Sequence, residues 1–174
     1  DCMIHIVLFE PEIPGNTGNI MRTCAAFHMK LHLIEPLGFH LDEKHLKRAG
    51  MDYRENVDYV KHINWDSFFQ EHGNQGLFYY VTRYGKHTPD SFMYPKDQEI
   101  YLVFGKESTG IPKPILANHE DFCMRIPMVE KARSLNLSNC VALCAYEVNR
   151  QWGYSGLSHT EVIKGANFLD QFKD

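Results

Sequence analysis

The N-terminal part of the chain follows the order strand, helix, strand, and this order restricts the folds that the chain can adopt. Residues 4–9 (IHIVLF) and 30–34 (KLHLI) are short apolar runs typical of buried strands. Between them, after a loop rich in proline and glycine, apolar residues recur at helical spacing as Ile20, Cys24 and Phe27. Two strands joined through a helix pair in parallel, so the sequence predicts an α/β fold on a mainly parallel sheet.

Strands and helices continue to alternate along the rest of the chain. Further strands are predicted at residues 76–81, 100–104 and 122–126, and further helices at 42–49, 64–69, 137–152 and 158–172. Asn64 is expected to cap the aromatic helix that follows it, and Ser158 and Glu161 have the spacing of a capping box. The helix at 137–152 is apolar almost all round, which predicts burial on more than one side.

Length and composition favour a single domain. We expect residues 1–174 to form one domain with helices on both faces of the sheet, and Asp1 and Cys2 to stand ahead of a natural start at Met3. The five cysteines form no C-x-x-C pair and lie among apolar residues, which is typical of reduced, buried thiols. No apolar run approaches the ~20 residues of a membrane span, so we expect a cytoplasmic protein with no membrane partner.

Charge and motifs exclude several function classes. A net charge of −4 argues against a protein that coats nucleic acid by bulk charge, although it is compatible with a local basic patch. Residues 105–110 (GKESTG) resemble a phosphate loop in composition only, because the G-K-[ST] ending is absent. Residues 15–18 (GNTG) match the short KH-type pattern, which arises often by chance. No G-x-S-x-G elbow or catalytic-cysteine signature is present.

The histidines give no sequence signal for a metal site. The chain has ten histidines, and they lie on separate segments without cysteine or carboxylate ligands at matching spacing. We therefore expect no metal.

Two strands end in unusual loops. The predicted strand at 100–104 continues into Gly105 and Glu107, and a glycine there suits either a plain turn or close backbone approach to a ligand. The strand at 122–126 is followed by small polar residues at 134–139 (SLNLSN), more than the capping of one helix needs. In open α/β sheets ligands bind at the carboxyl ends of strands, so the two loops are either two walls of one pocket or two separate turns.

A third segment, residues 16–22 (NTGNIMR), lies where the first loop enters its helix. Ordinary helix capping with a surface arginine explains it, as does a site in which Asn16 and Arg22 hold an anionic or hydroxyl-bearing substrate. The residues alone leave both interpretations open.

Together the three segments resemble a known family. NTGNIMR, LVFGKESTG and RIPM with SLNLSN resemble, in order and spacing, the three motifs of the SPOUT superfamily of S-adenosylmethionine-dependent RNA methyltransferases. The opening segment, HLIEPLGF and KRAGMDY narrow the resemblance to the single-domain, TrmL/YibK-like tRNA (cytidine/uridine-2′-O)-methyltransferases that modify the wobble nucleotide. The resemblance covers nearly the whole chain and implies a deep C-terminal trefoil knot, a rare exception to the rule that chains do not thread loops.

The resemblance also implies site residues, partners and a cofactor. The S-adenosylmethionine site would comprise Val81, Thr82, Gly105, Glu107, Ile126, Met128, Ser134, Leu135 and Asn136. The catalytic set would be Arg22 with Asn16, Ser138 and Asn139 as ribose-positioning groups. A guanidinium is almost always protonated, so stabilising an alkoxide or anchoring a phosphate suits Arg22 better than acting as a base.

The resemblance also implies contacts with a tRNA substrate and with a second subunit. The cations available for tRNA phosphates are Lys44, Lys47, Arg48, Arg54, Lys131 and Arg133. A solvated helix face explains Lys44 and Lys47 equally well. Family members act as homodimers, which places a subunit interface on the helix at 137–152 with Tyr146. The alternatives are 2′-O-methylation of another tRNA position or of rRNA, and a module that binds S-adenosylmethionine or RNA without catalysis.

Overall fold

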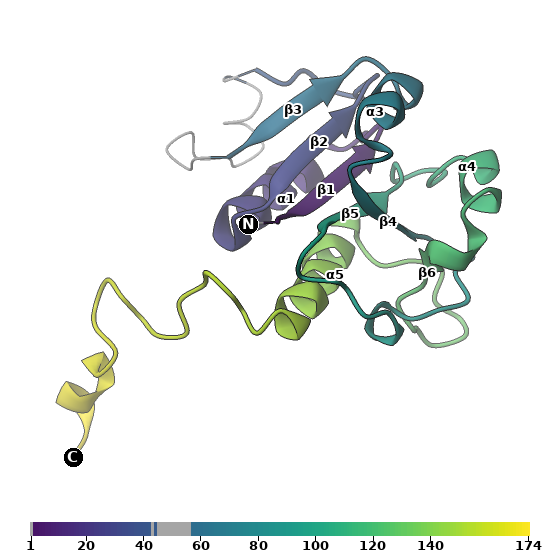
Figure 1. Ribbon diagram of the computed structural model, residues 1–174. Helices are drawn as coiled ribbons and strands as arrows, with labels where there is room; N and C mark the ends of the chain where they lie inside the picture. Colours follow the sequence, from purple (N-terminus) through teal and green to yellow (C-terminus); the bar gives the residue numbers. More distant parts are fainter. Residues whose placement is uncertain (1, 43, 45–56) are drawn as a thin grey trace.

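One parallel sheet organises the part of the chain that the structure describes. The structure is a computed structural model and describes residues 2–42, 44 and 57–174. Its strands are β1 (Ile4–Phe9), β2 (Lys30–Ile34), β3 (Tyr59–His62), β4 (Gly76–Val81), β5 (Glu99–Phe104) and β6 (Cys123–Met124). They lie in the order β3-β2-β1-β5-β4-β6, and all their pairings are parallel (Figure 1). The predicted α/β class is confirmed.

Helices cover both faces of this sheet, as predicted. The helices are α1 (Pro14–Phe27), α3 (Trp65–His72), α4 (Lys113–Ala117) and α5 (Leu137–Gln151), with 3₁₀ turns at Pro89–Ser91, Glu120–Phe122 and Phe168–Phe172. α1 and α5 share one hydrophobic cluster with the sheet, and α3 and α4 contribute to a second cluster on the opposite face. The central strands are therefore buried on both sides, which explains their unbroken apolar sequences.

The order of the strands creates a crevice between β1 and β5. These two strands are neighbours, but the chain leaves β1 toward α1 on one face and leaves β5 toward α4 on the other. Because the two connections diverge, the carboxyl ends of the strands stay uncovered, and such switch points are where α/β proteins bind ligands.

Several predicted boundaries were wrong. α1 begins at Pro14, so the segment expected as a loop up to residue 19 already forms the first helical turns. Proline suits the first helical position because its missing N–H would have no partner there. The strand predicted at 122–126 is limited to Cys123–Met124, since the Arg125 N–H donates to the carbonyl of His87, 2.7 Å away, outside the sheet ladder. The helix predicted at 42–49 lies almost wholly outside the described residues.

Two elements have no counterpart in the sequence-based prediction. β3 is a four-residue edge strand with a largely exposed sequence, YVKH, and α4 is a five-residue helix that follows a proline. Both are too short for hydrophobic periodicity to be recognised.

The predicted C-terminal helix is also wrong. Beyond α5 the chain extends away from the sheet and forms only the 3₁₀ turn Phe168–Phe172 (Figure 1). The side chains of Ser158 and Glu161 each accept a hydrogen bond from the backbone N–H two positions ahead, so they form no capping box. Val162 and Ile163 are exposed, so no packing compensates for the cost of ordering a helix. No helix among the described residues is long and apolar enough to cross a bilayer.

Removing residues 158–174 is expected to change the melting temperature by less than ~2 °C, because none of these residues belongs to either hydrophobic cluster. Val148→Ala in α5, whose side chain is fully buried, is the positive control and is expected to lower it by several degrees. Differential scanning calorimetry of the three proteins measures both effects. A large loss on truncation would mean that the tail packs against a surface that one chain does not provide.

Candidate functional site

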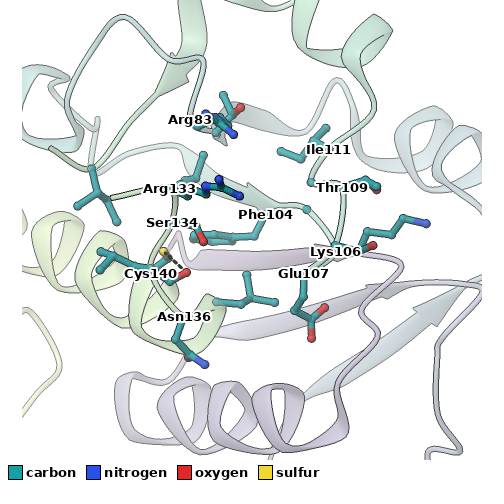
Figure 2. Close-up of a pocket in the computed structure, with 18 of the residues that line it drawn as sticks. Arg83, Phe104, Lys106, Glu107, Thr109, Ile111, Arg133, Ser134, Asn136 and Cys140 are labelled. Carbon is teal, nitrogen blue, oxygen red and sulfur yellow. Dashed lines mark hydrogen bonds between the residues drawn. The ribbon is translucent and has the colours of Figure 1, made fainter. Parts of the chain in front are cut away.

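A cavity of about 740 Å³ lies at the carboxyl ends of the strands, in the crevice that the strand order creates (Figure 2). Its walls come from four parts of the chain: Ile13 and Asn16 after β1, residues 81–84 after β4, residues around 104–113 after β5, and residues between 125 and 140. The two loops singled out in the sequence are therefore walls of one pocket.

Every residue predicted to bind the methyl donor lines this cavity: Val81, Thr82, Gly105, Glu107, Ile126, Met128, Ser134, Leu135 and Asn136. Of the predicted acceptor-side residues, Asn16 also lines it, whereas Ser138 and Asn139 lie in the first turn of α5 and Arg22 lies on an exposed side of α1. Arg22 follows Asn16 by six positions, which is about 9 Å along the helix axis.

Gly105 is required by the tight loop that follows β5. A Cβ atom on Gly105 would lie 2.1 Å from the backbone carbon of Gly110 and from the nitrogen of Ile111. Gly110 closes the loop by donating its N–H to the carbonyl of Lys106 at 2.9 Å, with a positive φ of 74° that favours glycine. The absence of a side chain at Gly105 thus lets the two ends of this loop lie against each other at the cavity wall.

Glu107 binds the beginning of α1. Its carboxylate accepts hydrogen bonds from the backbone N–H groups of Glu12 (2.9 Å) and Ile13 (2.8 Å) and from Nδ2 of Asn16 (3.2 Å). α1 has no side-chain cap of its own at Ile13, so this carboxylate supplies the anion that a helix N-terminus favours.

The link between the two loops is reciprocal. The Glu12 carboxylate accepts the backbone N–H of Ser108 at 2.9 Å, and hydrogen bonding from Ser108 lowers the pKa of the Glu12 carboxyl below its ordinary value. Each loop therefore holds the other through a carboxylate, and both carboxylates are used as acceptors.

Asn136 connects the third motif to the first. Its Oδ1 caps α5 by accepting the N–H groups of Ser138 (2.9 Å) and Asn139 (3.4 Å), and its Nδ2 donates to Oδ1 of Asn16 at 3.0 Å. Asn16, only 8% exposed, in turn donates a hydrogen bond from Nδ2 to the carboxylate of Glu107. The three motifs therefore meet at Asn16.

Several cations at the cavity were missed by sequence analysis. Arg83, Lys106, Lys113 and Arg125 line it together with the predicted Arg133. Two of them could have been found from the sequence. Arg83 and Arg125 lie within two residues of predicted strand ends, where α/β proteins place ligand-binding groups.

The other predicted cations are spread more widely. Lys131 and Lys44 are exposed and do not line the cavity. Lys47, Arg48 and Arg54 lie outside the described residues.

The chemistry of the cavity suits a ligand with an apolar ring and polar edges. Val81, Phe104, Ile126 and Leu135 supply apolar contacts, while loop backbone groups and small polar side chains supply hydrogen bonds. Cys140 also lines the cavity, and burial raises the pKa of its thiol, so it stays protonated and unreactive. The arrangement suits the binding and orientation of such a ligand.

Comparison with known proteins relates this chain to a protein family. Residues 3–146 match the SpoU rRNA Methylase family. The chain is 54% identical over 157 residues, 89% of its length and 99% of the relative's, to a candidate tRNA (cytidine(34)-2′-O)-methyltransferase of Geobacillus stearothermophilus.

Two solved structures extend the comparison. One concerns 2′-OH methylation of C/U34 on tRNA; it is 41% identical, with a TM-score of 0.77 and coverage of 88% of this chain and 98% of that one. The SpoU methyltransferase AviRb of Streptomyces viridochromogenes, in complex with AdoMet, shares the fold at 22% identity and a TM-score of 0.71, covering 88% of this chain and 59% of that one.

Gly105→Ala is expected to weaken S-adenosylmethionine binding at least tenfold, because its methyl group would collide with backbone and displace the loop. Gly15→Ala is the matched control, since a Cβ there meets nothing within 4 Å and the helical site tolerates alanine. Isothermal titration calorimetry with the donor measures both. Equal affinity in the two variants would show that the loop backbone does not contact the donor.

Glu107→Gln is expected to destabilise the protein by about 1–3 kcal/mol, because one carboxylate oxygen becomes an N–H₂ group facing other donors. Glu130→Gln, at an exposed position near the third motif, is the control and is expected to be neutral. Chemical denaturation gives the difference in unfolding free energy. If Glu107→Gln were as stable as Glu130→Gln, the carboxylate would not be holding α1.

Proposed function

Because the chain belongs to the SpoU rRNA methylase family, we propose that it is an S-adenosylmethionine-dependent enzyme that methylates the ribose 2′-oxygen of the wobble nucleotide, C34 or U34, of tRNA. The most direct support is that a relative 54% identical over nearly its whole length carries this activity in its name, while every predicted donor residue lines one cavity. A tRNA substrate is consistent with a cytoplasmic enzyme.

The reaction transfers a methyl group from a sulfonium to an oxygen. The ribose 2′-oxygen attacks the methyl carbon, the carbon–sulfur bond breaks with its electron pair going to sulfur, and the 2′-hydroxyl proton passes to water. The main demand on the protein is to align oxygen, methyl and sulfur and to stabilise the developing alkoxide.

The residues of this chain divide these tasks. Val81, Ile126 and Leu135 are proposed to sandwich the adenine of the donor, and the loop at Gly105 to contact it through backbone groups. Asn16, Ser138 and Asn139 are proposed to position the ribose near the N-termini of α1 and α5. Arg22, further along α1, is proposed to bind the phosphate or stabilise the alkoxide.

We also propose the knotted topology of SPOUT proteins for the C-terminal half. The loop after β4 and the segment after β6 cross closely, since Arg125 Nη1 donates to the carbonyl of Arg83 at 2.8 Å. A Cβ on Gly85 would lie 2.4 Å from the backbone of Met124. From β6, at the sheet edge, the chain then returns to the central strands, where α5 packs with α1. These crossings support a threaded path.

A homodimer fits the exposed side of α5. One side of this helix is buried, as at Val141 and Cys144, whereas Leu143 and Tyr146 on the other side are 52% and 51% exposed. The prediction that α5 is buried on more than one side is therefore unfulfilled within a single chain. A second subunit would cover these residues.

Methylation of rRNA is the second candidate within the family, because the matched family is described by that substrate. The tRNA substrate is favoured because the chain covers 99% of a relative whose name gives tRNA as the substrate. A non-catalytic binding module is disfavoured because the residues expected for donor and acceptor are all retained. Incubation with labelled donor and either tRNA or rRNA, followed by mapping of the methyl group, decides among the three.

Arg22→Ala is expected to lower methyl transfer to tRNA at least ~100-fold while changing donor affinity little, because Arg22 lies outside the cavity. Arg22→Lys keeps the charge but loses the planar guanidinium group, so its rate of methyl transfer is expected to lie between those of Arg22→Ala and the unaltered protein. Single-turnover kinetics and donor titration separate the effects. Near-normal transfer by Arg22→Ala would remove Arg22 from the mechanism and leave the methyltransferase assignment intact.

Tyr146→Glu is expected to convert a dimer into monomers, because a charge would be buried at the proposed interface. Sedimentation velocity at micromolar concentration measures the change, with Glu161→Lys in the exposed tail as the control. A wild-type protein that sediments as a monomer would contradict the proposed interface.

A further inference from the structure

A row of stacked rings crosses the sheet on the face opposite α1 and α5. His62 of β3, His32 of β2 and His5 of β1 follow one another with ring centroids 5.2 Å apart in each pair. Tyr101 of β5 continues the row, its ring 4.1 Å from that of His5. None of these residues lines the cavity, so methyl transfer does not account for the row.

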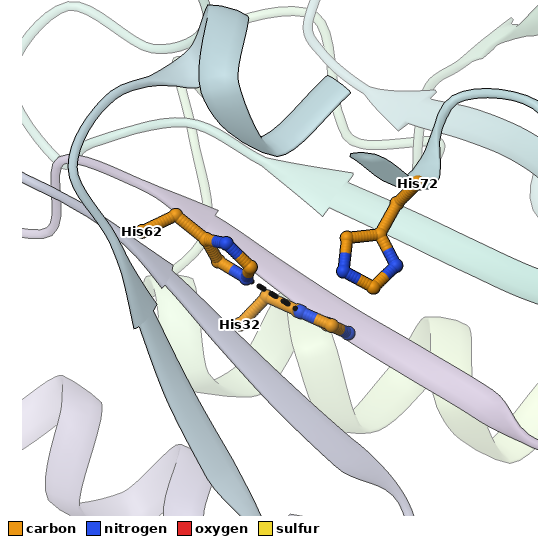
Figure 3. A group of neighbouring side chains, drawn as sticks. All are labelled: His32, His62 and His72. Atoms are coloured by element: carbon orange, nitrogen blue, oxygen red, sulfur yellow. Dashed lines mark hydrogen bonds between the residues drawn. The ribbon is translucent and has the colours of Figure 1, made fainter. Parts of the chain in front are cut away.

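Hydrogen bonds fix the ring tautomers along this row. The carboxylate of Glu99 lies 2.8 Å from Nε2 of His5 and accepts a hydrogen bond from its N–H, so Nδ1 of His5 carries a lone pair. That lone pair accepts from Nε2 of His32 at 2.9 Å, which leaves the lone pair of His32 on Nδ1. Nδ1 of His32 faces Nε2 of His62 at 3.0 Å (Figure 3).

His5, His32 and His62 are all buried, with His32 fully so. Their rings are therefore held in place by packing and by the hydrogen bonds between them.

His72 completes a group of three histidines at the Nδ1 side of His32. It is the last residue of α3, its side chain is 14% exposed, and its ring centroid lies 4.9 Å from that of His32 (Figure 3). One ring nitrogen from each of His32, His62 and His72 can be chosen so that all lie within 4.8 Å of one another.

We propose that His32, His62 and His72 bind one Zn²⁺ ion, or a divalent transition metal of similar preference, with His5 and Glu99 orienting His32. Tetrahedral zinc with nitrogen ligands at ~2.0–2.1 Å holds them roughly 3.4 Å apart. His32 and His62 are already close to this separation at 3.0 Å, and His72 needs to approach by at most about 1.4 Å from the edge of the site.

The ring protons and the four coordination positions of the metal can all be accounted for. The metal takes the place of the proton between His32 and His62, and His62 carries its proton on Nδ1 instead. His32 donates its other N–H toward a carboxylate through His5, which is the outer-shell arrangement that orients metal-binding histidines. The fourth position is left for water or for Glu71, whose Oε1 lies 3.6 Å from Nε2 of His72.

The consequence would be structural. The ion would tie the edge strand β3 and the end of α3 to β2, in a region where β3 has only four residues. The histidine spacing led us to expect no metal, because the three histidines lie on separate segments of the sequence. The fold brings them together.

Titration of the untagged, chelator-treated full-length protein with Co²⁺ and Zn²⁺ tests the proposal. We expect about one equivalent of Co²⁺ to give the visible absorption bands of a tetrahedral site, Zn²⁺ to displace it, and Zn²⁺ to raise the melting temperature by several degrees. His72→Gln, at the exposed edge, is expected to weaken binding at least tenfold, whereas His159→Gln in the exposed tail binds as the unaltered protein does.

Two results would overturn the site. Absence of both the Co²⁺ bands and the thermal shift in the unaltered protein would leave a hydrogen-bonded histidine row without metal, and this outcome requires no variant to fold. Unchanged affinity in His72→Gln would place the bound metal elsewhere. Circular dichroism establishes that His72→Gln is folded, and retained methyl-donor binding shows that the two sites are independent.

Discussion

The hydrogen bonds that meet at Asn16 are the constraint on which the site depends. Asn136 donates to Asn16 and Asn16 donates to Glu107, so one short path of amide and carboxylate groups joins segments separated by 120 and 91 positions. Hydrogen bonds to a charged group contribute roughly 1.5–3 kcal/mol each, and the Glu107 carboxylate accepts three of them. The start of α1, where the acceptor would bind, is thereby fixed relative to the donor loops.

The strand order explains why such a connection is needed. Because the chain leaves β1 and β5 toward opposite faces, the loops after them begin side by side without a continuous backbone between them. A crevice of this kind would stay open and loosely defined if each loop were held only by its own residues. The Glu107 carboxylate at the beginning of α1, and the Glu12 carboxylate on Ser108, close one side of it and leave the other side as the cavity.

Much of the fold could be predicted from the sequence because its central strands are apolar and buried on both faces. β1, β2, β4 and β5 were found nearly to the residue for this reason. β3 and α4 were missed because short elements leave no period, and the C-terminal helix was predicted from a capping pattern that says nothing about packing.

For the site, family resemblance supplied the residues lining the cavity but not the connections between them. Glu107 caps α1, and His32 meets His62 on the neighbouring strand. Both contacts depend on which strands pair in the sheet, and no local sequence pattern encodes that pairing.

Local charge resolves the apparent conflict between an acidic protein and an RNA substrate. The net charge is −4, yet Arg83, Lys106, Lys113, Arg125 and Arg133 all line one cavity. Glu107, the acid at this place, has both oxygens occupied by donors of α1 and Asn16, so its charge is partly offset before any ligand arrives. Screening limits such fields to about 8 Å at physiological salt. A phosphate at the cavity mouth therefore interacts with this cluster far more strongly than with the acidic groups spread over the remaining surface, and a low isoelectric point is no obstacle to RNA methylation.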